Sequence, residues 1–252
     1  MGKIGWRRIL LVGSLVLLQT IGLFGNPLSA DKGKKWFRGQ LHCHTYLSDG
    51  QAFPEQVAAI YKQRGYNFLA ITDHNHFADD KDVWREIAPT SGKWPPKVTQ
   101  GIFDSYIQQF GKDWVDVKTN GVVTSVRLKT YEEIKARFEE PGKFLLLPGV
   151  ELTQLASTNI HANYINLPVN LPCIKGPDLV KRIQGETEAG KIIAMNAAEA
   201  KEAAAQLNRP YLFMLNHPFW VYWDIRPEVL LDCPEVRFFE IANGGSRYAP
   251  EP

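Results

Sequence analysis

After about residue 30, short apolar runs alternate along the chain with longer stretches of mixed apolar and polar residues. Apolar runs of this length predict strands, over 36–41, 67–72, 144–152, 160–167, 211–215 and 236–241. The mixed stretches predict helices, over 54–64, 131–140, 178–184 and 197–207. Strands that alternate with helices imply βα units around a largely parallel sheet, open or closed into a barrel. The fold class expected is therefore α/β.

A long polar interval, about 77–143, interrupts the alternation after the second predicted strand. Turns are marked in it by Trp94-Pro95-Pro96 and by Asn120-Gly121, and 122–128 is a candidate strand. We expect this interval to be an insertion that covers one face of the domain and shapes the substrate pocket.

The first thirty residues have the pattern of a secretory signal peptide. Lys3, Arg7 and Arg8 precede an apolar run over 9–24, and small residues follow at 28–30. The run is shorter than the roughly 20 apolar residues that a membrane-spanning helix needs. We therefore expect a leader over 1–30, a mature domain over 31–252 and export to the periplasm or the medium. An uncleaved membrane anchor is the alternative.

The charge balance argues against general binding to nucleic acid. The 252 residues carry 29 basic and 27 acidic side chains, and without the leader's three basic residues the balance becomes 26 to 27. A nearly neutral body gives no broad electrostatic attraction for a polyanion, and nothing indicates a stable protein partner. The three cysteines, Cys43, Cys173 and Cys233, reveal no disulfide framework.

Histidines and acids gather where the predicted strands begin or end. Because residues i and i+2 of a strand point to the same face, His42 and His44 can bind one metal ion while Cys43 points away. Two surface histidines would be the simpler reading of that pair alone. Asp49 close behind, and the motifs at the other strand ends, favour ligands.

The segment Asp73-His74-Asn75-His76 follows the second predicted strand. Four polar residues at a strand end need either solvent or a metal ion. His74 is the expected ligand, and Asp73 is expected to orient a liganding imidazole. His76 is a ligand, a substrate contact or an ordinary loop histidine. We take Asp73 and His76 as the candidate catalytic residues.

Glu151 ends the apolar run 144–150 and could bridge two metal ions, which a neutral imidazole cannot do. His161 opens the next predicted strand, and His217 follows the one after it. Imidazoles and carboxylates gathered at strand ends suit several divalent metal ions. The candidate metal ligands are His42, His44, Asp49, His74, Glu151, His161 and His217.

From about Arg38 to Gly245 these motifs, in this order, resemble the polymerase and histidinol phosphatase (PHP) superfamily. The resemblance implies a distorted (β/α)7-type PHP barrel with two or three metal ions, usually Zn, Mn or Fe. It assigns His42, His44 and Glu151 to the first metal, Glu151, His161 and His217 to the second, and Asp49 and His74 to the third. The segment 240–244 also resembles one found in carbaryl-hydrolase-like proteins.

One departure from the family pattern concerns its last motif, an Asp-x-His after a further strand. The sequence reaches Pro252 without it. We expect the C-terminal end of the domain to be missing from this chain, since an open barrel would expose strand edges. A protein that lacks two ligands is the alternative.

The resemblance implies a metal-dependent hydrolase, most simply a phosphoesterase that uses a metal-activated hydroxide. A carboxylic or carbamate ester or an amide could be attacked at the same metal site, and a degenerate metal-binding domain without activity is the third alternative. A serine hydrolase is disfavoured because no Gly-x-Ser-x-Gly motif is present. The expected substrate is a small phosphorylated or ester compound.

Overall fold

The computed structural model describes residues 35–90, 96–154, 160–172, 189–218, 225, 227–231 and 233–243. The expected leader, the helix predicted over 178–184, Cys173 and the residues after 243 lie outside this set. The chain divides into two units, 1–37 and 38–252, and the second is described below. In the described part of the chain, no helix has both the length and the apolar character needed to cross a membrane.

Six strands form the main sheet, in the order β1-β2-β7-β8-β9-β10. They are β1 (Gly39–Gln40), β2 (Phe68–Ile71), β7 (Leu145–Gln154), β8 (Ile160–Ile165), β9 (Leu212–Leu215) and β10 (Phe238–Phe239). Each lies within or overlaps a strand predicted from an apolar run, although β1 and β10 are short. The α/β class is confirmed, whereas the complete seven-stranded barrel stays a prediction.

The sheet is mixed, so the expectation of a largely parallel sheet is only partly met. β1, β2 and β7 are parallel, and so are β9 and β10, but β8 is antiparallel to both β7 and β9. Only residues 155–159 separate β7 from β8, and a parallel neighbour would need a crossover of about a dozen residues or more. The beginning of β8 therefore lies at the edge where β7 and β9 end.

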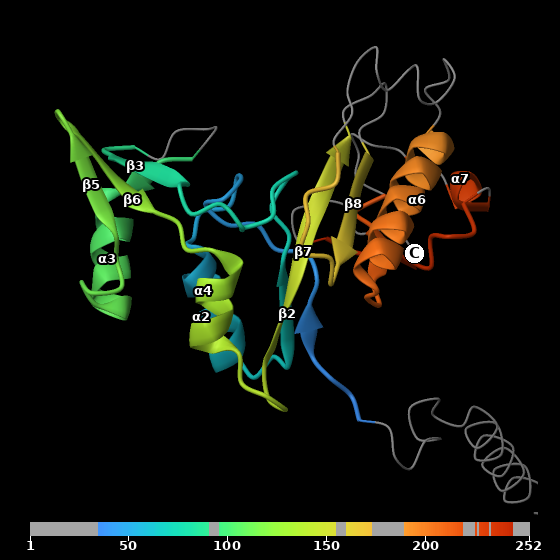
Figure 1. Cartoon of the computed structure of the whole chain (residues 1–252), viewed down its shortest axis with the longest axis horizontal. Helices are drawn as coiled ribbons and strands as arrows, with labels where there is room; N and C mark the ends of the chain where they lie inside the picture. The colour runs from blue at the N-terminus through green and yellow to red at the C-terminus, as the bar shows by residue number, and fades with distance from the viewer. Residues whose placement is uncertain are drawn as a thin grey trace, which may run out of the picture. The chain divides into compact units, whose positions relative to one another are not determined.

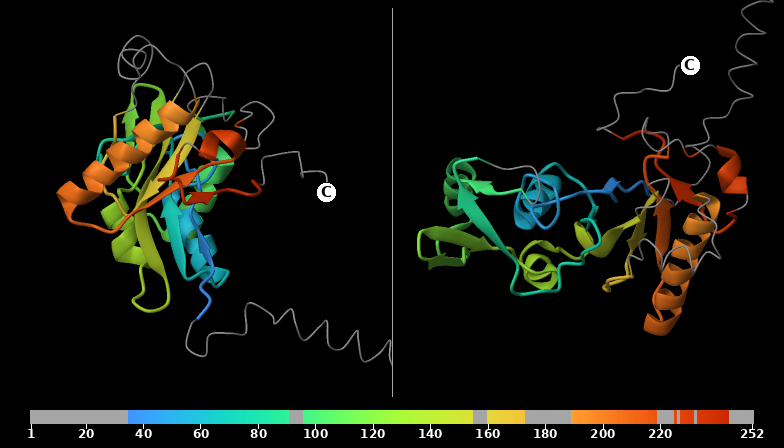
Figure 2. Two further views of the ribbon diagram at one scale, coloured as in Figure 1. Left: turned by 90° about the vertical axis from the view of Figure 1, so that its right-hand side faces the viewer. Right: turned by 90° about the horizontal axis from the view of Figure 1, so that it is seen from above.

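Helices pack against this sheet at two places (Figure 1). α2 (Pro54–Gln63) and α4 (Tyr131–Phe138) pack beside β2 and β7. Their shared core consists of Val57, Ala58, Leu69, Ile134, Phe138, Phe144 and Leu146. α6 (Ala189–Leu207) packs against β8 and β9, and α7 (Pro227–Leu231) contacts α6 (Figure 2).

Local sequence explains where α2 and α4 begin. Pro54 stands in the first turn of α2, where its missing N–H costs nothing, and the chain leaves the helix through Gly65 at a φ of 74°. α4 starts with a capping box. The Thr130 hydroxyl accepts from the Glu133 N–H at 3.3 Å, and the Glu133 carboxylate accepts from the Thr130 N–H at 2.8 Å.

The polar interval forms a second sheet, in the order β4-β3-β6-β5. Its strands are β3 (Trp84–Ala88), β4 (Val98–Thr99), β5 (Val117–Asn120) and β6 (Val123–Arg127). α3 (Gln100–Phe110) lies beside β3 and β4. Only β6 and α4 were predicted within the interval, and α4 packs on the main sheet. The second sheet and α3 therefore occupy only part of the interval 77–143.

A buried carboxylate joins this second layer to α2. Glu55 of α2 has no exposed surface and accepts from the Tyr106 hydroxyl and from Trp114 Nε1, the latter at 3.0 Å. Phe53 stacks on the Tyr106 ring with the centroids 3.8 Å apart. Burial raises the pKa of Glu55, and the hydrogen bonds and the charge of Lys129 only partly oppose this.

Candidate metal centre

Each strand of the main sheet brings at least one side chain to a single cluster. His42 and His44 follow β1, His74 follows β2, Glu151 lies within β7, His161 lies at the start of β8, His217 follows β9 and Glu240 follows β10. His161 belongs with the others only because β8 runs antiparallel, which brings its first residues to the shared edge. The mixed sheet thus gathers ligands from both kinds of strand end.

Glu151 is the centre of the cluster, and its side chain has no exposed surface. Its Oε1 lies 3.1 Å from His42 Nε2, 3.2 Å from His161 Nδ1 and 3.5 Å from His217 Nε2. Its Oε2 lies 2.6 Å from His74 Nδ1 and 3.4 Å from His44 Nε2. Five imidazoles therefore meet one carboxylate.

The five rings form a closed circle around Glu151. Successive ring centroids are 5.1 Å apart from His42 to His44, 4.4 Å from His44 to His74 and 5.2 Å from His74 to His161. The circle closes through His217, 5.0 Å from His161 and 5.5 Å from His42. These five histidines are the five predicted as ligands, and the structure brings all of them together with Glu151.

The nitrogen atoms around Glu151 outnumber the places where they could donate. A carboxylate accepts at about four lone-pair positions, yet Asn216 Nδ2 also donates to Oε1 at 2.7 Å, beside the five imidazoles. His42 Nε2 and His44 Nε2 also face each other at 3.0 Å. Cations between these atoms would use the imidazole lone pairs directly. The site therefore fits divalent ions that accept nitrogen and oxygen ligands, such as Zn, Mn or Fe.

Four groups of three side chains place possible ligand atoms within 4.8 Å of one another. They are His42–His44–Glu151, His44–Asp49–His74, His74–Glu151–His161 and His42–His217–Glu240. The first is the set that the resemblance gives to the first metal, and the second contains its pair for the third. The expected second set is divided, because His161 groups with His74 and His217 groups with Glu240.

Asp49 reaches the cluster from a tight turn. Its Oδ1 lies 2.6 Å from His44 Nδ1, and its Oδ2 lies 3.5 Å from His74 Nε2. Hydrogen bonding to these two rings lowers the pKa of Asp49. Gly50 makes the turn possible, because a Cβ there would lie 2.4 Å from the backbone of His44.

Without metal ions, the carboxylates hold protons on several of these rings. Burial lowers the pKa of His42, but Glu151 and Glu240 more than offset it and raise the value to about 9. For His44, Asp49 and Glu151 overcome the same effect of burial and raise the pKa to about 10. Metal ions and protons therefore compete for these imidazoles.

The hydrogen bonds of Asp73 go to the turn that follows His44. Asp73 has no exposed surface. Its Oδ1 accepts from Thr45 N at 2.7 Å, Ser48 N at 3.0 Å and Ser48 Oγ at 2.5 Å, and its Oδ2 accepts from Thr45 Oγ1 at 2.8 Å. Asp73 thus holds the turn between His44 and Asp49 and has no direct hydrogen bond to a ring in the described part of the cluster.

His76, the other candidate catalytic residue, belongs to none of the four groups among the described residues. It lines a small pocket together with Leu47, Ile71 and Tyr131. Its Nε2 is buried, and Asp73 lines the same pocket. The role predicted for His76 in the chemistry gains no support from this position.

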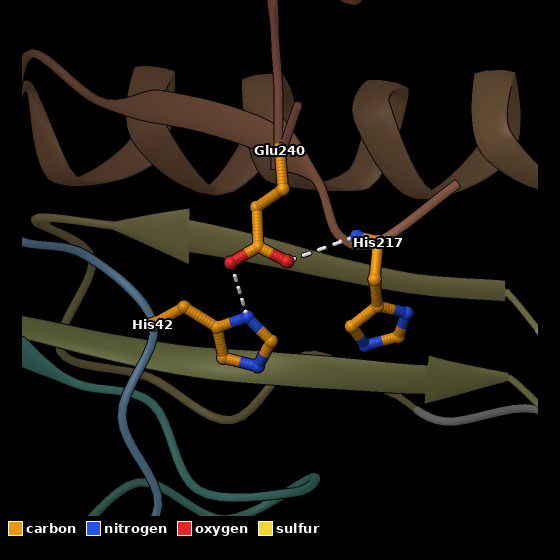
Figure 3. Close-up of side chains that lie close together, drawn as sticks. All are labelled: His42, His217 and Glu240. Atoms are coloured by element: carbon orange, nitrogen blue, oxygen red, sulfur yellow. Dashed lines mark hydrogen bonds and ion pairs between the residues drawn. The ribbon is translucent and has the colours of Figure 1, made fainter. Parts of the chain in front are cut away.

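Glu240 is the acid of the cluster that the ligand prediction left out. Its Oε1 lies 2.8 Å from His42 Nδ1, and its Oε2 accepts from the backbone N–H of His217 at 2.9 Å (Figure 3). A signal was present in the sequence, since Glu240 stands near the end of the apolar run 236–241 as Glu151 follows 144–150. Asn216, which donates to Glu151, was likewise not among the predicted site residues.

No protein-family model matches the chain, and none of the curated proteins does. Several solved chains are similar to it, among them the following two. One is a two-domain protein from Bacteroides vulgatus containing a predicted PHP-like metal-dependent phosphoesterase. Its identity is 17% over 82% of this chain and 45% of that protein, with a TM-score of 0.41. The chain thus spans less than half of that protein's length.

The other is a protein from Bifidobacterium adolescentis predicted to be a metal-dependent phosphoesterase. Its identity is 14% over 82% of this chain and 78% of that protein, with a TM-score of 0.38. Both scores are low, so neither likeness assigns a function, and the metal site rests on its own geometry. The resemblance to the carbaryl-hydrolase-like branch stays a prediction.

Proposed function

We propose that this protein is a metal-dependent hydrolase and that it acts on a phosphoester. The observation that carries the proposal is the closed circle of five imidazoles around the buried carboxylate of Glu151. A circle of this kind has a high cost in a protein interior unless cations share its lone pairs. Bound divalent ions supply Lewis acidity and activate water near neutral pH.

The chain's own residues determine how two or three ions would be held. Glu151 presents one oxygen to His42, His161 and His217 and the other to His44 and His74, so a single carboxylate can bridge two ions. Together with Glu151, Asp49 and Glu240 bring three negative charges to the cluster. These offset much of the charge of two divalent ions and leave a net positive field, which favours an anionic substrate such as a phosphate ester.

Side-chain exposure shows where substrate would reach the site. Glu151, His217 and His161 are 0%, 5% and 8% exposed, whereas His44 is 19% and Asp49 is 44% exposed. The cluster is therefore buried on the side of His161 and His217 and open to solvent on the side of Asp49. The scissile bond of the substrate would lie beside His44, Asp49 and His74. The buried side chains of Glu151, His161 and His217 would keep the ions in place.

Metal analysis combined with paired substrate assays tests the proposal. We expect the purified chain to retain Zn, Mn or Fe and to hydrolyse chromogenic phosphate mono- or diesters only when it is loaded. Glu151→Gln should lose both metal and turnover. Glu202→Gln is the matched control, because it makes the same change on the exposed surface of α6.

Two results would contradict the proposal in different ways. Metal-dependent turnover of carbamate or carboxylic esters alone would keep the metal site and replace the substrate class. Full loading without turnover of any ester would favour a metal-binding domain without activity.

A further inference from the structure

The search for a role beyond metal ligation leads to Glu240, the acid at the end of β10. Its side chain is 15% exposed, and its carboxylate lies between His42 and the backbone of His217 (Figure 3). Its backbone N–H donates to the carbonyl of Leu215 in β9 at 3.0 Å. Both its carboxylate oxygens already accept hydrogen bonds, unlike the oxygens of a carboxylate that is free to bind a metal ion.

We propose that Glu240 is a positioning residue that fixes the orientation of two metal ligands, His42 and His217, rather than a ligand itself. The inference rests on the proposed function, because it requires a metal site to orient. It adds a residue, and a task for each of its two oxygens, to the seven ligands predicted from the sequence.

The first oxygen determines which nitrogen of His42 faces the metal site. Oε1 of Glu240 lies 2.8 Å from His42 Nδ1, so this nitrogen carries the proton and donates it. The other nitrogen, Nε2, points at Glu151 Oε1, 3.1 Å away. A carboxylate that accepts from the far side of a liganding imidazole fixes its tautomer and ring angle and makes it a better donor to the metal.

The second oxygen holds the backbone that carries His217. Oε2 accepts from the His217 N–H at 2.9 Å and from Asn243 Nδ2 at 3.1 Å. His217 has a φ of 28°, a positive value that residues other than glycine rarely adopt and that needs support from neighbours. Glu240 supplies this support, and it thereby couples the direction of the His217 ring to that of His42.

The test combines zinc titration with NMR of the histidine rings, on the full chain. Glu240→Gln keeps the side-chain volume and one acceptor oxygen, Glu240→Ala removes both acceptors, and Glu235→Gln makes the same change at an exposed site before β10. We expect Glu240→Gln to lower zinc affinity by about 10- to 100-fold without changing the number of ions bound. Glu240→Ala should lose more, and Glu235→Gln should bind as the wild type does.

The NMR measurement separates positioning from general damage to the fold. Wild-type protein should show a downfield, slowly exchanging Nδ1–H proton of His42, identified by its absence in His42→Asn. The signal should disappear in Glu240→Ala and remain in Glu235→Gln.

Three outcomes would overturn a claim, and they are distinguishable. Unchanged zinc affinity and an unchanged His42 proton in Glu240→Ala would refute the positioning role. Loss of one whole zinc ion in Glu240→Gln would make Glu240 a ligand instead. A wild-type chain that takes up no metal would refute the proposed function itself.

Discussion

Asp73 offers the sharpest test of how the site is built, because its sequence context and its structure give it different roles. Its neighbours His74 and Asn75 made it a candidate catalytic residue, yet its carboxylate is fully buried against Thr45 and Ser48. Asp73→Ala and Asp73→Asn probe the two roles. The alanine removes every acceptor, and the asparagine keeps one oxygen in nearly the same place.

The size of the effect follows from the donors that would lose their acceptor. The hydroxyls of Thr45 and Ser48 can rotate toward other partners, and the Ser48 N–H also donates to the Thr45 carbonyl at 3.1 Å, so the Thr45 N–H is the backbone donor that would lose its acceptor. A buried donor without an acceptor costs about 1–3 kcal/mol and the lost bond of the Ser48 N–H about 0.5–1.5 kcal/mol, so Asp73→Ala should lose roughly 1.5–4.5 kcal/mol of unfolding free energy. Asp73→Asn exchanges charged for neutral hydrogen bonds and should lose about 1–3 kcal/mol. The larger loss is a substantial part of the roughly 5–15 kcal/mol typical of a domain.

Urea denaturation, zinc titration and phosphoester turnover measured on the same samples decide between the roles. We expect stability to fall in the order wild type, Asp73→Asn, Asp73→Ala, and metal affinity to fall in the same order, because the turn carries His44 and Asp49. Turnover of folded, fully loaded Asp73→Asn should remain measurable. An Asp73→Asn protein as stable as wild type, loaded with metal and yet inactive would show that Asp73 takes part in the chemistry and that the structural reasoning is wrong.

Three further predictions follow from single side chains. Burial raises the pKa of the Glu55 carboxyl. Its contribution to stability is therefore present below the ordinary carboxyl pKa of 4.5 and is lost as the pH rises through the raised pKa. Thermal melts from acidic to neutral pH should show this loss of stability in the wild type and not in Glu55→Gln. Arg85 donates to the carbonyls of Tyr46 and Leu47 at 2.6 and 2.8 Å, so Arg85→Lys should cost about 1–3 kcal/mol in urea denaturation, and an unchanged midpoint would contradict this. Burial raises the pKa of Cys43 to about 12, so iodoacetamide should label it at neutral pH only after unfolding, as mass spectrometry can show.

The candidate ligands could be singled out in the sequence because several of them stand next to an apolar run. His74 and His217 follow strands that are mostly buried and Glu151 lies within another, and polar residues at such places need partners. What the sequence could not show was the direction in which each side chain points after the strand ends. Asp73 and His74 are neighbours, but one turns toward Thr45 and the other toward Glu151.

The second sheet was largely missed for a different reason. All four residues of β5 are exposed and all five of β3 are only partly buried, so neither strand has the alternation of apolar and polar residues that predicts a half-buried strand. The direction of β8 was missed because apolar runs give the position of a strand but not its orientation. The length of the connection from β7, visible in the sequence, would have decided it.

The hairpin of β7 and β8 also gives the site an order of assembly. Thr153 pairs with His161 across the hairpin, so Glu151 and His161 come together through a short, local closure of the chain. The contact between His42 and Glu240 instead joins residues 198 positions apart. Closing a longer loop costs more entropy, and contacts of low sequence separation tend to form sooner in folding. Glu151 and His161 would thus come together early, and the His42–Glu240 contact would be the last part of the cluster to close.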